Sequence, residues 1–243
     1  MAVHQSGNWL YVANGADNNI GQYSIAKDGS LTAMKNPTVP TGTSPAELAL
    51  SPNGKYAYVT DCGSNQISMY AIDSLSGQLS PLNPPAAVTG GSCAWGMVIH
   101  PSGNFAYVAV TSGLIAQYSI NSKTGVLSAL TPATIVETTF PTDLYAEPSG
   151  RYVYVVNRDS NNISQYSVNQ STGVLTALST KTAASGKYPF SITGDQSGTY
   201  VYVANLTDET ISTYVINPLN GLLALVTTSA KKANFGLFKL FDF

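Results

Sequence analysis

The sequence predicts an all-β fold, a β-propeller of five four-stranded antiparallel blades, and three observations support this prediction. One pattern, which opens on a glycine and closes on a tyrosine, occurs five times along the 243 residues. A second glycine follows each tyrosine, and these glycines lie 48 residues apart every time: Gly29, Gly77, Gly125, Gly173 and Gly221. The runs between them are short and rich in Val, Ile, Tyr and Thr, which suit a pleated sheet. A fixed period of this size, filled with short strands, is typical of radially stacked sheets.

Each repeat contains four expected strands, which the second repeat illustrates. We expect them at residues 47–50, 56–59, 67–72 and 78–82. The first two meet at Ser-Pro-Asn-Gly (51–54), where proline presets φ and glycine supplies the positive φ that ends a tight turn. Uncharged side chains alternate to both faces of the second strand, so a single sheet cannot bury them and must pack against its neighbours.

The repeats predict one domain over residues 1–243. They run without interruption from Gly7 to about Leu225, which leaves no room for a linker. The expected blades span about residues 2–35, 45–84, 94–132, 141–180 and 189–228, followed by a tail at 229–243.

Composition argues against two classes of partner. Charged residues make up 10% of the chain, and the net charge of −2 comes from 11 basic and 13 acidic residues. Non-specific nucleic-acid binding needs clustered Lys and Arg, and the only adjacent basic pair is Lys231-Lys232, so we expect no nucleic acid partner. No apolar run approaches the length of about 18 residues that a membrane span requires, so we expect no membrane partner.

Four tetrapeptides carry a resemblance to a known family. Tyr-Val-Ala-Asn at 11–14 and 202–205, Tyr-Val-Thr-Asp at 58–61 and Tyr-Val-Val-Asn at 154–157 resemble the YVTN-type repeats of lactonase-type propellers, similar to 6-phosphogluconolactonase. The resemblance covers about residues 2–230. It implies a ring of seven blades, so the five expected blades form either a segment of a larger propeller or an unusually small ring. It implies lactonase chemistry, or a surface-layer or scaffold role without chemistry.

We expect a binding site on the face that carries the longer, more varied loops, since binding residues concentrate on variable loops held by a rigid scaffold. These loops connect the second strand to the third and precede each first strand. Glu47 and Asp143 depart from the repeat there, because their counterparts are Gly96 and Ser191. Either acid can supply a general base beside the central channel. The alternative is that both are solvated channel residues.

Arg158 also departs from the repeat, since uncharged residues stand in its place in the other loops. Asn157-Arg158-Asp159 resembles the Asn-Arg-Gly-His loop of the lactonase-type family, without its glycine-histidine half. The resemblance implies arginine and acid groups that grip an anionic, ring-shaped substrate. The catalytic candidates are Glu47, Asp143 and Arg158, and the predicted ligand-binding residues are Asp61, Trp95, Asn157, Arg158 and Asp159.

Both histidines are expected to be structural. His4 and His100 share a repeat position, just before the turn between the first and second strands, with Ser51, Glu147 and Asp195. A polar side chain there can cap the backbone N–H groups of the turn. No other histidine is present, so a Ser-His-Asp arrangement on the loop face is excluded. Without a CxxC pair or a histidine cluster, we expect no metal and no cofactor.

Two function classes remain. The first is a binding or interaction propeller that holds a small molecule, a glycan or a protein on the loop face, and the missing histidine favours it. The alternative is a hydrolase that opens the lactone of a sugar acid. A seam between the first and last blades predicts either closure by residues 234–243 or self-association.

The two cysteines bear on location. Cys62 and Cys93 are 31 residues apart, but their loops lie on the same face of neighbouring blades. They are either bridged or two free thiols. A disulfide persists in an oxidising space, so a bridge indicates an extracytoplasmic protein and free thiols indicate a cytoplasmic one.

Overall fold

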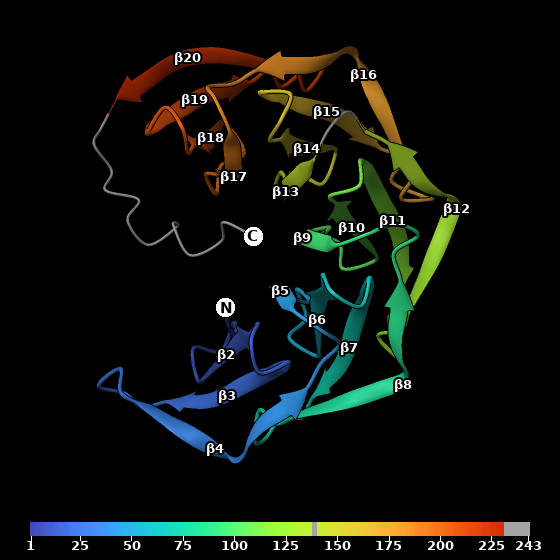
Figure 1. Cartoon of the computed structure of the whole chain (residues 1–243), viewed down its shortest axis with the longest axis vertical. Coiled ribbons are helices and arrows are strands. Elements are labelled where there is room, and N and C mark those ends of the chain that lie inside the picture. The colour runs from blue at the N-terminus through green and yellow to red at the C-terminus, as the bar shows by residue number, and fades with distance from the viewer. Residues whose placement is uncertain (138–139, 231–243) are drawn as a thin grey trace. The chain divides into compact units, whose positions relative to one another are not determined.

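The computed structural model describes residues 1–137 and 140–230, and this part of the chain forms 20 β-strands and no helix that could cross a membrane. The strands make five four-stranded antiparallel sheets, each with its strands in chain order (Figure 1). The chain divides into two compact units, residues 1–136 and 137–243, and each is described by itself. The predicted all-β fold of four-stranded blades is confirmed. Residues 234–243, which the sequence offers as a closing segment, lie outside the described residues.

The first unit holds three sheets. They are β1 (Ala2–Val3), β2 (Trp9–Asn14), β3 (Asn19–Ile25) and β4 (Leu31–Pro40); β5 (Pro45–Leu50), β6 (Tyr56–Asp61), β7 (Gln66–Ile72) and β8 (Leu79–Val88); and β9 (Ala94–Ile99), β10 (Phe105–Val110), β11 (Leu114–Ile120) and β12 (Leu127–Val136). Figure 1 shows the first strands β5 and β9 near each other and the last strands β8 and β12 on the outside.

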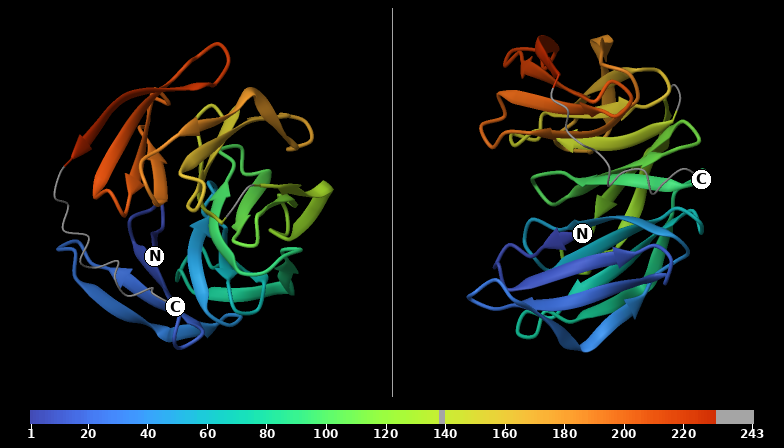
Figure 2. Two further views of the ribbon diagram at one scale, coloured as in Figure 1. Left: turned by 45° about the horizontal axis from the view of Figure 1, so that its top comes forward. Right: turned by 60° about the vertical axis from the view of Figure 1, so that its left-hand side comes forward.

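The second unit holds two sheets. They are β13 (Pro141–Ala146), β14 (Tyr152–Asn157), β15 (Asn162–Val168) and β16 (Leu175–Ala184); and β17 (Pro189–Gly194), β18 (Tyr200–Asn205), β19 (Thr210–Ile216) and β20 (Leu223–Ala230). The first strands β13 and β17 again lie in contact. Figure 2 shows the sheets of both units from two further sides.

The fourth strand of each sheet is longer than the sequence predicts. β8 spans ten residues and contains three prolines, whereas the pattern predicts a strand only at 78–82. A fourth strand pairs on one side only, and an edge strand tolerates proline because the missing N–H leaves no gap in a ladder. The pairing continues past a register shift between Ser68 and Tyr70 of β7. The sheets therefore begin where the blades were expected and extend beyond their predicted ends.

Both histidines cap turns, as predicted. His4 Nδ1 accepts the backbone N–H of Ser6 at 3.2 Å, and His100 Nδ1 accepts that of Ser102 at 3.2 Å. The His4 Nε2 lies 3.0 Å from the carbonyl oxygen of Gly54, to which it donates as the protonated ring nitrogen. Both rings are buried. They act at the turns between first and second strands, on the opposite end of the sheets from the loop face.

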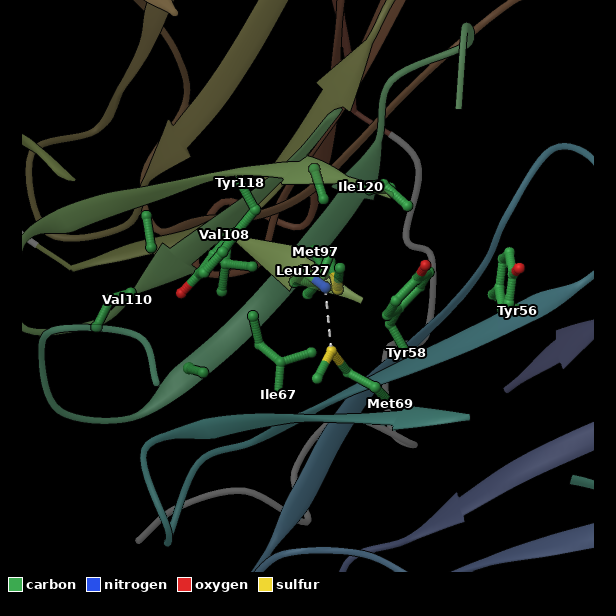
Figure 3. Close-up of a cluster of buried hydrophobic side chains, with 13 residues drawn as sticks. Tyr56, Tyr58, Ile67, Met69, Met97, Val108, Val110, Tyr118, Ile120 and Leu127 are labelled. Carbon is green, nitrogen blue, oxygen red and sulfur yellow. Dashed lines mark hydrogen bonds between the residues drawn. The ribbon is translucent and has the colours of Figure 1, made fainter. Parts of the chain in front are cut away.

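Buried tyrosines join neighbouring sheets. Tyr58 of β6 is fully buried, and its hydroxyl donates to the carbonyl oxygen of Gly125, in the turn between β11 and β12, at 2.7 Å. Figure 3 shows Tyr58 in a cluster with Met69, Met97 and Leu127, in which Met69 Sδ accepts the backbone N–H of Leu127 at 3.4 Å. Apolar burial and these hydrogen bonds hold the second and third sheets face to face.

Cys62 and Cys93 form a disulfide with an S–S distance of 2.09 Å. Cys62 follows β6 and Cys93 precedes β9, so the bridge links two neighbouring sheets on the loop face of the first unit. Of the two states that the sequence allows, the structure has the bridged one.

The disulfide predicts both the thiol content of the protein and the stability of a variant without the bridge. Unfolded but unreduced protein should show no reactive thiol, and the double variant Cys62→Ser, Cys93→Ser should lose about 3 to 4 kcal/mol of unfolding free energy, because the bridge no longer restricts the unfolded chain. Thiol titration and urea denaturation measure these two quantities. Two reactive thiols in protein that was never exposed to reductant would contradict the bridge.

Candidate functional site

Arg158 directly follows β14 and lies in a loop of the loop face of the second unit. Its guanidinium carbon is 3.3 Å from the centroid of the Phe140 ring and 4.8 Å from that of Tyr188. Its Nε donates to Asp159 Oδ1 at 2.7 Å, and the Arg158 side chain is 20% exposed. The cation is therefore held against two aromatic rings and beside one carboxylate.

The backbone conformation orients the rings of Phe140 and Tyr188 toward the loop that carries Arg158. Phe140 and Tyr188 occupy the same repeat position, directly before β13 and β17, and have left-handed φ angles of 51° and 57°. The carbonyl oxygen of Phe140 accepts the backbone N–H of Arg158 at 3.0 Å, and the Tyr188 N–H donates to Asn161 Oδ1 at 2.8 Å. A left-handed residue turns the chain sharply. These hydrogen bonds fix both turns to the β14–β15 loop that carries Arg158.

The outer nitrogens of Arg158 are available to a ligand. Within the described part of the chain, Asp159 is the only side chain that accepts a hydrogen bond from this guanidinium, and it uses Nε. The two Nη groups form a planar fork that matches a carboxylate or a phosphate. Because the rings limit the movement of the side chain, Arg158 can present this fork at little further cost in conformational entropy.

Asp143 lies on β13 in the same sheet. It pairs with Val156 of β14, two residues before Arg158. Its Oδ2 accepts hydrogen bonds from Ser191 Oγ at 2.9 Å and from the Ile192 N–H at 3.0 Å, and its Oδ1 accepts the next N–H of its own strand at 2.8 Å. The carboxylate therefore bridges the first strands of the two sheets in the second unit.

Burial raises the pKa of Asp143 from 3.8 to about 6, and the three hydrogen bonds oppose the rise without cancelling it. A carboxyl group with this pKa is ionised at neutral pH but is a stronger base than an ordinary aspartate. Asp143 thus has the protonation behaviour that a general base requires.

Asn157 and Asp61, two of the predicted ligand-binding residues, are fully buried. Asn157 Nδ2 donates to Ser164 Oγ at 2.8 Å, and Asp61 Oδ2 accepts from Ser68 Oγ at 2.6 Å. Burial also raises the pKa of Asp61. Each is the last residue of the second strand of its sheet, so both side chains support the loop that follows that strand.

Glu137 also belongs to this part of the second unit, although it is not among the residues predicted from the sequence. Its side chain is fully buried, its Oε2 accepts from Ser164 Oγ at 2.8 Å, and Lys181 Nζ lies 3.8 Å from the same oxygen. Ser164 therefore connects Glu137 to Asn157, directly beneath the Arg158 loop.

The missed residues share one signal. They all depart from the repeat in the loops before the first strands. Glu137 stands where the other repeats have Thr41, Thr89 and Ser185, and Phe140 and Tyr188 stand where they have Ser44 and Cys93. Register comparison of these loops, in addition to those after the second strands, would have found all three.

Glu47 and Trp95 lie together in the first unit. The Glu47 N–H donates to Thr60 Oγ1 at 2.9 Å, and Thr60 Oγ1 donates to the carbonyl oxygen of Trp95 at 2.6 Å. Thr60 thereby ties β5 to β9 near the loop face.

The structure thus brings the predicted residues together in two groups. Asp143, Asn157, Arg158 and Asp159 belong to one sheet of the second unit, while Glu47, Asp61 and Trp95 belong to the first unit. The central channel that the sequence predicts beside Glu47 and Asp143 involves two separately described units and stays a prediction. Among residues 1–137 and 140–230, no three His, Cys, Asp or Glu side chains are grouped to hold a metal ion.

The sequence of the chain matches a known protein family. The model of the lactonase family, described as a seven-bladed β-propeller, matches residues 1–96 and 96–238. The chain belongs to this lactonase family. The family fold has seven blades, and the described residues of this member form five sheets.

Individual relatives agree with the family. The 6-phosphogluconolactonase of Pectobacterium atrosepticum is 26% identical over 42% of the chain, and that of Bacillus subtilis is 26% identical over 56%. These matches span only 30% and 40% of the two relatives. A crystal structure of a Lactobacillus plantarum protein superposes with a TM-score of 0.82 at 22% identity, covering 95% of this chain and 70% of that one, which establishes likeness of fold.

Asp143 makes stability depend on pH. Its pKa is 3.8 in the unfolded chain and about 6 in the folded one, so within this window the folded state retains a proton that the unfolded state has lost. The unfolding free energy of the wild type, relative to Asp143→Asn, should therefore fall as pH rises through the window, by about 2 kcal/mol once partial exposure is allowed for.

Urea denaturation of both proteins from about pH 3 to about pH 7, about two pH units on either side of the midpoint of that window, measures the difference. The asparagine is a matched control because its amide oxygen still accepts from Ser191 and Ile192 but does not titrate. Parallel stability curves for the two proteins would show that Asp143 has an ordinary pKa.

Proposed function

We propose that this chain carries the site of a lactonase that opens the ring of a sugar-acid lactone on the loop face. The observation that carries the proposal is the Arg158 side chain, held against Phe140 and Tyr188 with its outer nitrogens available in the described part of the chain. Membership of the lactonase family supports the same reading. Family membership and the two 6-phosphogluconolactonase relatives favour the lactonase over the binding propeller, which the residues alone favour.

Arg158 selects the substrate in this proposal. Its planar fork accepts two oxygens of a phosphate or a carboxylate, and the exposed Asp159 keeps the guanidinium oriented through Nε. Because the named relatives are 6-phosphogluconolactonases, a phosphorylated sugar lactone is the first substrate to test.

Asp143 takes the proton. Ring opening requires attack of water on the lactone carbonyl, cleavage of the ring C–O bond, and transfer of a proton to the leaving ring oxygen. The net reaction converts one lactone and one water into a hydroxy acid, which releases one proton at neutral pH. A carboxylate with a pKa of about 6 accepts the proton from the attacking water and returns it to the ring oxygen.

Ligand binding without turnover is the second candidate function. One observation favours it, since the Asp143 carboxylate already accepts three hydrogen bonds, two of them across to β17. A carboxylate committed to joining two strands acts on the ligand only through its remaining lone pairs. The partner in that case is a small molecule, glycan or protein segment with an anionic group for Arg158.

The disulfide extends the proposal to location. Cys62 and Cys93 are bridged, and disulfides persist in oxidising compartments. We therefore place the activity outside the reducing cytosol.

Lactone turnover tests the proposal. In a pH-stat, the wild type should consume base faster than the spontaneous hydrolysis of a phosphorylated sugar lactone. Arg158→Ala should lower kcat/KM by about tenfold to a hundredfold, because it removes a charge-assisted hydrogen bond to the anion. The loss should be smaller for the unphosphorylated lactone, which has no such anion.

Arg151→Ala is the matched control, since Arg151 is the only other arginine and lies at the turn between β13 and β14, away from the loop face. Melting curves of each variant separate loss of packing against Phe140 and Tyr188 from loss of substrate contact. Equal losses for Arg151→Ala and Arg158→Ala would refute the role of Arg158. Calorimetric binding of the lactone without base consumption would support the binding function instead.

A further inference from the structure

One contact recurs wherever two neighbouring sheets meet within a unit. An aromatic residue at the start of a second strand covers the glycine in the turn between the third and fourth strands of the next sheet. The tyrosine two residues later donates its hydroxyl to the carbonyl of that glycine. The donor and acceptor pairs are Tyr11 and Gly77 at 2.6 Å, Tyr58 and Gly125 at 2.7 Å, and Tyr154 and Gly221 at 2.6 Å.

The fit at these contacts excludes a side chain on the glycine. A Cβ added to Gly77 would lie 2.4 Å from the Trp9 ring, and one added to Gly221 would lie 2.3 Å from the Tyr152 ring. A Cβ added to Gly125 would clash with the Tyr56 ring in the same way. The aromatic pair and the turn glycine are thus two halves of one docking contact.

The sheet β17–β20 presents the aromatic half, and no turn among the described residues packs against it. Tyr200 and Tyr202 are 40% and 36% exposed, whereas their counterparts Tyr152 and Tyr154 are 8% and 0% exposed. No described residue accepts a hydrogen bond from the Tyr202 hydroxyl. Ile211, on the neighbouring strand β19, is 40% exposed, although the same repeat position is fully buried between the paired sheets. We call this surface the aromatic face.

The sheet β1–β4 presents the other half. Gly29 has a left-handed φ, at 83°, as the other turn glycines do. However, no described atom lies within 4 Å of the place that an added Cβ would take. Leu31, two residues later, is 51% exposed, whereas its counterparts Leu79 and Leu127 are 8% and 5% exposed. We call this surface the turn face.

We infer that the aromatic face of one copy of this chain binds the turn face of a second copy. The Tyr200 ring covers Gly29 of the second copy, and the Tyr202 hydroxyl donates to the Gly29 carbonyl oxygen. Ile211 and Leu31 complete the apolar contact, and none of the four side chains is charged. The occupant is a second copy because each copy carries both halves of a contact that already joins neighbouring sheets within both units.

This association is heterologous, because the two faces differ. Each copy that binds through one face leaves its other face available, so copies add head to tail into a ring or an open string. The inference does not depend on the proposed lactonase, since neither face includes Arg158 or Asp143.

Sedimentation velocity of the full chain over about a hundredfold range of concentration tests the association. The weight-average mass should rise with concentration. Tyr202→Phe, which keeps the ring and removes the hydroxyl, should weaken association about fivefold to tenfold, as expected for one buried hydrogen bond. A monomer at every concentration would overturn the inference.

Two blocking variants test the head-to-tail geometry. Ile211→Arg blocks the aromatic face and Leu31→Arg blocks the turn face, so each protein alone should be monomeric. An equimolar mixture should form a one-to-one heterodimer and nothing larger, because one copy keeps an aromatic face and the other a turn face. Leu75→Arg is the matched control, since Leu75 is 91% exposed in a turn outside both faces and its substitution should leave association unchanged.

Circular dichroism verifies that each variant is folded. A mixture of the two blocked proteins that stays monomeric would overturn the inference. Equal disruption by Leu75→Arg would do the same.

Discussion

The hydrogen bond from a buried tyrosine hydroxyl to the carbonyl oxygen of a turn glycine sets how one sheet packs on the next. Each sheet is apolar on both faces, so burial alone would allow neighbouring sheets to slide. A hydroxyl left unpaired inside such an interface costs about 1 to 3 kcal/mol, which penalises any other register. Tyr58 finds its acceptor at Gly125 only when the turn lies directly against the second strand. The glycine permits this approach because it has no side chain and tolerates a positive φ.

Rigid packing at one end of the sheets leaves the other end to vary. The loop face is held by polar side chains within the chain, such as Asn161, which accepts the Tyr188 N–H. On this support, Phe140, Arg158 and Tyr188 give the loops of two neighbouring sheets a distinct chemistry without a change in the fold of either sheet. This division explains how a family with one architecture can place a charged contact in a single blade.

The candidate site combines one cation with one acid of raised pKa, and the two groups have different supports. Arg158 is oriented by aromatic contacts and by an exposed aspartate, so its position depends on the loops. Asp143 is oriented by donors from β17, so its position depends on the packing of two sheets. The same packing that buries Asp143 raises its pKa to about 6. Sheet packing and acid–base chemistry are therefore coupled in the second unit.

Sequence alone was enough to predict the repeat, the four strands of each blade, the turn chemistry and the loop that carries Arg158. These features are local or periodic, so composition and spacing encode them directly. The length of the fourth strands, the burial of Asp61 and Asn157, and the network through Glu137 were decided only by tertiary structure. The fourth strands are longer because an edge position tolerates proline. Burial depends on neighbours that are far away in the chain. Neither the edge position nor these neighbours can be read from a single repeat. The Cys62–Cys93 bridge belongs to the same class, because sequence placed both thiols on one face but only packing brings their sulfur atoms within bonding distance.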